Sequence, residues 1–130
     1  MSGNISNPNR HEVEAAGIVK ANGEWHTIMS ASEVNIFEVV AVAYGKRGEG
    51  QYASIYAIAS NAYSGKWGSI RSFKNYYSWK WWKRLRLRWT GNPFEYQLQI
   101  KTCSDYDSHG EIDYKVYRLG GDFTYKADKI

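Results

Sequence analysis

Residues 85–102, LRLRWTGNPFEYQLQIKT, alternate between apolar and polar side chains on both sides of a Gly-Asn-Pro turn. On the first arm, Leu85, Leu87 and Trp89 fall on one side and arginines fall on the other. The return arm alternates in the same way, with Tyr, Leu and Ile against Glu and Gln. A period of two on both arms indicates an antiparallel hairpin with one face in the core and one face in water.

The segments around this hairpin are also short and bounded by Gly and Asn. Strands are predicted at residues 11–21, 24–29, 34–44, 51–63, 70–77 and 111–119. An Asn-Gly pair at 22–23, the strongest two-residue hairpin signal, joins the first two. No segment has a convincing amphipathic helical pattern. About eight strands with turn signals between them are typical of a β-sandwich or jelly roll. We therefore expect an all-β fold, an antiparallel β-sandwich of the jelly-roll type.

Two central segments, VNIFEVVAVAY at 34–44 and QYASIYAIASNAY at 51–63, are apolar on both faces of the strands that they would form. A strand that is apolar on both faces is normally buried on both. A two-layer sandwich buries only one face of each sheet, so a second covering surface is needed. We expect a homotrimer in which these strands line the axis. The alternative is a monomer in which the chain's own loops cover them.

Composition limits the other possibilities. The 130 residues suffice for one domain, expected at 11–121, between a flexible lead or linker end at 1–10 and a polar tail at 122–130. With 43% hydrophobic and 23% charged residues, the chain is not disordered. It has no apolar run of about 20 residues that would insert into a membrane. One cysteine excludes an internal disulfide framework and a cysteine-built zinc site.

The densest aromatic segment is YYSWKWWKR at 76–84. Side chains alternate along a strand, so its three tryptophans cannot all face one core. Exposed rings stack on sugars or nucleobases, and neighbouring Lys and Arg add donors and cation–π contacts. The candidate ligand-binding residues of this segment are Tyr76, Tyr77, Trp79, Trp81 and Trp82. A subunit interface and the protein core remain alternatives for the same rings.

Two polar features lie near this segment in the sequence. Asp105, Asp107 and His109, in the loop at 103–110, could orient sugar hydroxyls, although a solvated turn is the alternative. The loop lacks the full calcium-binding pattern, and we expect no metal and no cofactor. The arginines at 84, 86 and 88 could follow a phosphate backbone or pair across strands with Glu95 and two glutamines. No carboxylate pair or catalytic triad is recognisable, so we expect no enzyme activity.

The order EVVAVAYGKRGEGQYASIYAIA, then LRLRWTGNPFEYQLQIKT, then DYKVYRLGG resembles the C-terminal head domains of phage tail-fibre and bacterial fibre-type adhesins. The resemblance covers about residues 17–121 and lies in the pattern and order of strands. Such heads are similar to the trimeric jelly roll of the tumour-necrosis-factor and complement globular-head class. The resemblance implies a trimeric knob that binds a cell-surface glycan or protein through exposed loops. It carries over no ligand residues, because such heads differ in their loops.

These observations predict a non-catalytic receptor-binding domain that recognises a cell-surface ligand, plausibly a glycan. The polar N-terminus has no secretory signal, which agrees with a virion-associated or extracellular fibre tip released by lysis. The net charge of +4 permits an acidic partner without requiring one. The alternative is a nucleic-acid-binding β domain that uses the aromatic and basic segment 76–88. We expect it less, because no recognisable nucleic-acid motif accompanies these residues.

Overall fold

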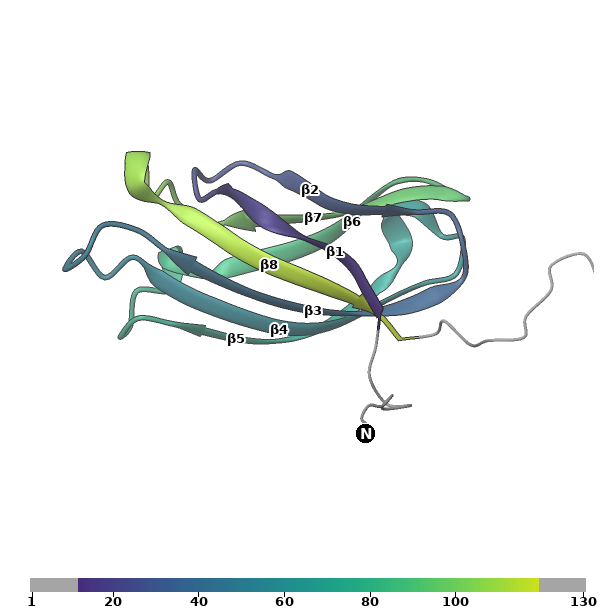
Figure 1. Ribbon diagram of the computed structural model, residues 1–130, viewed down its shortest axis with the longest axis horizontal. Helices are drawn as coiled ribbons and strands as arrows, with labels where there is room; N and C mark the ends of the chain where they lie inside the picture. The colour runs from purple at the N-terminus through teal and green to yellow at the C-terminus, as the bar shows by residue number, and fades with distance from the viewer. Residues whose placement is uncertain (1–11, 120–130) are drawn as a thin grey trace, which may run out of the picture.

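The computed structural model describes residues 12–119 and shows two antiparallel sheets packed face to face (Figure 1). The predicted lead at 1–10 and tail at 122–130 lie outside the described residues. The strands are β1 (Glu12–Lys20), β2 (His26–Ala31), β3 (Asn35–Tyr44), β4 (Tyr52–Asn61), β5 (Ser69–Tyr76), β6 (Leu85–Asn92), β7 (Glu95–Thr102) and β8 (Glu111–Arg118). Three one-turn 3-10 helices interrupt the loops, η1 (Gly65–Trp67), η2 (Trp81–Lys83) and η3 (Asp107–His109). The prediction of an all-β sandwich is confirmed.

The larger sheet has the order β1-β8-β3-β4-β5 and the smaller one has the order β2-β7-β6. All neighbouring strands are antiparallel. The first strand therefore pairs with the last, while β3–β4 and β6–β7 are hairpins within their sheets. No helix in the described part of the chain is long and apolar enough to cross a membrane.

The hairpin predicted from the alternating sequence is formed by β6 and β7. Leu85 pairs with Thr102, and the register continues without a bulge to the pair Asn92 and Glu95. Leu85, Trp89 and Leu98 are buried, as the alternation predicts. The intervening polar residues lie on the outer face of the smaller sheet, which we call the polar outer face.

The core lies between the sheets and is filled from one face of each strand. On β3 and β4 these are Phe37 and Val39 together with small alanines and Ile55. The indole of Trp89, from the smaller sheet, meets the Phe37 ring edge-on at 6.2 Å between ring centroids. The alanine-rich segment at 51–63 is a strand as predicted, because its alternate residues face this core.

The opposite face of the larger sheet is the apolar outer face, and Val40, Val42, Tyr56 and Phe73 define it. Val42 is 47% exposed and Phe73 is 76% exposed. The Tyr56 and Phe73 rings stack across β4 and β5 with their centroids 6.4 Å apart. The strands that the sequence marks as apolar on both faces thus bury one face in the single chain and expose the other.

The loops divide between the two ends of the sandwich. Loops 21–25, 45–51, 77–84 and 103–110 gather at one end, on the left of Figure 1, which we call the loop end. Strand β1 begins and β8 ends at the opposite end (Figure 1). The described chain therefore enters and leaves the sandwich at the end away from these loops.

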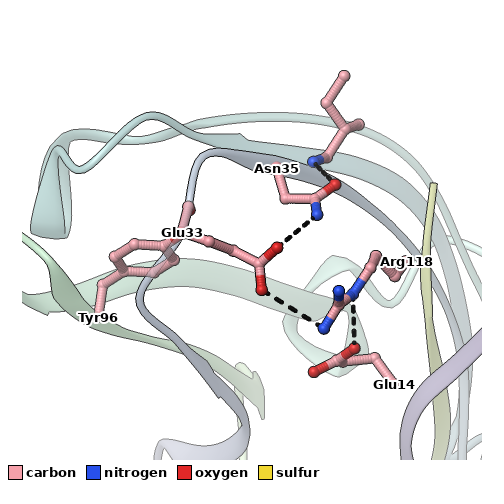
Figure 2. A network of polar contacts seen from close by, with 6 residues as sticks. Glu14, Glu33, Asn35, Tyr96 and Arg118 are labelled. Atoms are coloured by element: carbon pink, nitrogen blue, oxygen red, sulfur yellow. Dashed lines mark hydrogen bonds and ion pairs between the residues drawn. The ribbon is translucent and has the colours of Figure 1, made fainter. Parts of the chain in front are cut away.

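A polar network joins the strands at that opposite end (Figure 2). The Arg118 guanidinium contacts the Glu14 carboxylate at 3.1 Å and the Glu33 carboxylate at 3.4 Å. The Asn35 amide donates to Glu33 Oε2 at 2.8 Å, and the Tyr96 hydroxyl donates to the Glu33 main-chain carbonyl. The network ties β1, β8 and β3 to the turn before β3, and Tyr96 joins the smaller sheet to it.

Candidate functional site: the aromatic and basic loop end

The loop at 77–84, which we call the aromatic loop, is held by its own backbone. The amide of Lys80 donates to the Tyr77 carbonyl at 3.1 Å, and that of Lys83 donates to the Lys80 carbonyl at 2.9 Å. The Trp81 amide donates to the Trp79 carbonyl at 2.8 Å. These bonds fold the loop into a turn followed by η2, so its side chains project from an ordered backbone.

The three tryptophans predicted as ligand-binding residues form one cluster. The Trp82 ring is half-buried, and the rings of Trp79 and Trp81 meet it edge-on at centroid distances of 5.3 Å and 5.8 Å. Trp79 is 70% exposed and Trp81 is 57% exposed. A place in the core is therefore excluded for these two, and a ligand or another subunit remains as their partner.

The two tyrosines lie apart from each other. Tyr76 is half-buried, and its ring packs partly against the hydrophobic core. Tyr77 is exposed, and its ring lies 5.9 Å from that of Tyr52 on β4. Both tyrosines line an open hollow of about 410 Å³ above Val42 and Ser54. Tyr77 thus borders both the aromatic loop and the larger sheet.

The loop at 103–110 is fastened to the aromatic loop. The Ser104 hydroxyl donates to the Trp82 carbonyl at 2.7 Å, and the buried Tyr106 hydroxyl donates to the Lys83 carbonyl. The Cys103 amide donates to the Arg84 carbonyl at 2.9 Å. Two loops far apart in the sequence are therefore joined, so the two groups of candidate residues lie on neighbouring loops at the same end of the sandwich.

The polar residues of the 103–110 loop have different roles. Asp105 accepts the Asp107 amide at 2.7 Å, so one of its carboxylate oxygens stabilises the turn. Asp107 and His109 are exposed, and the Ser108 hydroxyl lies 3.4 Å from His109 Nδ1. Asp107 and His109 are therefore available to a ligand, while Asp105 also serves the loop itself.

The arginines lie along the polar outer face, next to the loop end. The Arg88 Nε donates to Gln99 Oε1 at 2.8 Å, which confirms the predicted cross-strand pairing for this glutamine. Glu95 does not take part in it, because it lies opposite Asn92. Arg84 donates to the Trp81 carbonyl at 3.0 Å, and its guanidinium lies 5.5 Å from the Trp81 ring centroid.

Trp25 is a residue of this surface that sequence reasoning missed. Its ring is approached by Arg88 at 4.3 Å, Lys101 at 5.1 Å and Arg86 at 5.6 Å, measured to the ring centroid. One sequence signal points to this region: residues 50–94 contain no Asp or Glu, but eight Lys and Arg and five of the six tryptophans. The overall charge of +4 hides this asymmetry.

Among residues 12–119, no group of three His, Cys, Asp or Glu side chains is placed to hold a metal ion. Comparison with protein-family models, curated proteins and solved structures finds no match to this chain. The loop end therefore offers a ligand three kinds of groups: exposed indole rings, cations, and carboxylates on an adjoining loop.

Proposed function

We propose that this chain is a non-catalytic receptor-binding head domain that recognises a cell-surface glycan with its loop end. The observation that carries the proposal is the exposure of Trp79 and Trp81 on a loop that is hydrogen-bonded to the loop exposing Asp107 and His109. Indole faces stack on the apolar faces of sugar rings, and carboxylates and imidazoles hydrogen-bond sugar hydroxyls. The binding groups sit on two loops fastened to each other, so little ordering is needed on binding.

The places where β1 begins and β8 ends support a role at the tip of a larger assembly. β1 begins and β8 ends at the end of the sandwich opposite the tryptophans. A shaft attached there would leave the loop end free to meet a receptor. This arrangement is the one that the resemblance to phage tail-fibre and adhesin heads implies, and it suits a fibre tip on a virion or outside a cell.

We further propose that the domain is a homotrimer of jelly-roll type. Exposed Val42, Tyr56 and Phe73 on the apolar outer face support the association, because contiguous apolar patches of this kind mark interaction sites. Pairing of the first strand with the last supports the jelly-roll comparison. Weak binding at each of three identical sites would be strengthened through effective concentration.

Nucleic-acid binding is the second candidate, and the acid-free stretch of residues 50–94 favours it. Exposed Asp105 and Asp107 on the adjoining loop favour a glycan instead, because carboxylates accept hydrogen bonds from sugar hydroxyls. Salt separates the two: affinity for nucleic acid falls steeply as salt rises, whereas affinity for a neutral glycan changes little.

The test is a glycan array probed with the wild type and with Trp81→Ala and Trp79→Ala. We expect each substitution to weaken the bound signals by about tenfold or more, because tryptophans in binding sites are often worth 2 kcal/mol or more. Trp67→Ala is the matched control, since Trp67 is 78% exposed but lies in η1 at the opposite end. Unchanged binding in both loop variants, or equal loss in the control, would refute the proposed site.

A further inference from the structure

Four cations form a line that we call the basic stripe: Arg84, which directly precedes β6, Arg86 and Arg88 on β6, and Lys101 on β7. Arg86 and Lys101 stand directly opposite each other in the β6–β7 ladder. Like charges in this position destabilise a sheet. Within the described residues, no carboxylate forms an ion pair with any member of the stripe, since both ion pairs there belong to Arg118.

Neutral groups hold these cations in place instead. The Trp25 ring lies within 5.6 Å of Arg86, Arg88 and Lys101. Gln99 accepts from Arg88 and donates to the Thr27 hydroxyl at 3.0 Å. A π face and an amide orient the cations but leave their positive charge uncancelled.

An alternative explanation of the basic stripe is that its charges protect the edge of the sheet. Strand β6 is the last strand of its sheet, and charges on an edge strand block pairing with other chains. It does not account for Lys101, which lies on the central strand β7. Nor does it account for the convergence of cations from two strands on one indole. The arrangement fits an anion that lies across both strands.

The positive field extends around the edge of the sandwich. Burial lowers the pKa of the Lys74 ammonium on β5, and the charges of Arg84 and Arg86 lower it further. At the same end the stripe joins the aromatic loop, where the Arg84 guanidinium lies above the Trp81 ring. A chain stacked on Trp81 can therefore continue along the stripe.

We infer that the ligand of the loop end is an anionic glycan chain, whose sugar rings stack on Trp81 and whose acidic groups bind Arg84, Arg86, Arg88 and Lys101. This inference rests on the proposed function and names its substrate class. A glycan is favoured over a nucleic acid because Asp107 stands exposed on the adjoining loop, where its carboxylate can accept hydrogen bonds from sugar hydroxyls.

The probes are dextran, dextran sulfate of the same length, polygalacturonate and a single-stranded oligodeoxythymidine, with binding followed by calorimetry at low salt. Dextran against dextran sulfate isolates the anionic group, and polygalacturonate tests carboxylate in place of sulfate. We expect dextran sulfate or polygalacturonate to bind more tightly than dextran, with the difference shrinking as salt rises.

The diagnostic variant is Arg86→Gln with Arg88→Gln, both exposed, so the fold is expected to persist. It should weaken binding of the anionic polymer by about tenfold or more, because hydrogen bonds to charged groups are the strong ones. The variant Lys66→Gln with Arg71→Gln changes the net charge equally but lies off the stripe, and it should have little effect. Equal losses in both variants, or no loss in the first, would overturn the inference.

Binding measurements on Trp81→Ala distinguish a failure of this inference from a failure of the proposed function. If sugars bind through Trp81 with no preference for the anionic polymer, only the present inference fails. If dextran sulfate binds through the arginines with no contribution from Trp81, the stacking site fails and the anionic site stands. Tighter binding of the oligodeoxythymidine than of dextran sulfate, lost in the arginine variant, would identify a nucleic-acid site and overturn both.

Discussion

Two tyrosine hydroxyls are buried in the sandwich, and each donates a hydrogen bond to a main-chain carbonyl. Tyr106 donates to the Lys83 carbonyl at the loop end, and Tyr96 donates to the Glu33 carbonyl at the opposite end. Burial raises the pKa of both hydroxyls above the usual value for tyrosine. The folded protein therefore favours the neutral form of each, because a buried phenolate would lose its hydration.

This shift predicts how stability depends on pH. Below about pH 10 the folded and unfolded chains both keep these tyrosines neutral, so their contribution is fully present. Above about pH 10 the unfolded chain loses protons first, and the free energy of unfolding falls by up to about 1.4 kcal/mol per pH unit per tyrosine. Urea unfolding between pH 8 and 11 measures this decline. Tyr106→Phe should make it shallower, and an identical slope in that variant would contradict the assignment.

Adjacent residues of strand β6 have opposite surroundings, so substitutions at the two positions should affect stability differently. Leu85 is fully buried in the core, whereas Arg86 faces solvent opposite Lys101. Leu85→Ala should lower the free energy of unfolding by about 2–5 kcal/mol. Arg86→Gln should change it by less than about 0.5 kcal/mol or raise it, because repulsion from Lys101 is removed. Denaturant titration of the two variants tests this, and a large loss for Arg86→Gln would contradict the outward placement.

The elements show what sequence patterns can predict. Alternation located the β6–β7 hairpin and its faces because each residue's side follows from local geometry. The second strand was predicted at 24–29 but lies at His26–Ala31, because Glu24 belongs to a turn in which its amide donates to Asn22 Oδ1 at 3.2 Å. The hairpin predicted from the Asn-Gly pair at 22–23 is not formed, because β1 pairs with β8 and β2 pairs with β7 in the other sheet. The division of strands between sheets depends on such contacts between segments distant in sequence.

Local sequence patterns also found only part of the candidate site. The tryptophans of the aromatic loop were found because they are neighbours in the sequence. Trp25 was missed because its cationic partners, Arg86, Arg88 and Lys101, come from strands far along the chain. Tyr76, the last residue of β5, packs partly against the core and also lines the open hollow beside Tyr77, which its position in the sequence alone did not indicate.

At the scale of the whole molecule, the two ends of the sandwich are built differently. The network of Arg118, Glu14 and Glu33 fixes the end where the described chain enters and leaves (Figure 2). The loop end instead exposes indoles and carboxylates on fastened loops. The apolar outer face runs along the side between them, so association through this face would leave three loop ends pointing the same way in a cyclic assembly.

The apolar outer face predicts the mass of the protein in solution. Light scattering at micromolar concentration should return three times the chain's 15.0 kDa. Val42→Asp should return the monomer mass, because association would bury the new carboxylate among Val40, Tyr56 and Phe73 at a large cost in desolvation. Gln97→Asp, an equal change of charge on the exposed polar outer face, should leave the mass unchanged.

A wild-type monomer would refute the trimer and leave the apolar outer face to a different partner. A trimer that persists in Val42→Asp would place the interface elsewhere on the sandwich. Dissociation also has a functional consequence: the Val42→Asp monomer keeps every residue of the loop end, so its affinity for a single short glycan should equal that of the wild type. On a surface densely coated with the same glycan it should bind more weakly by about 10²-fold or more, because the second and third contacts are lost.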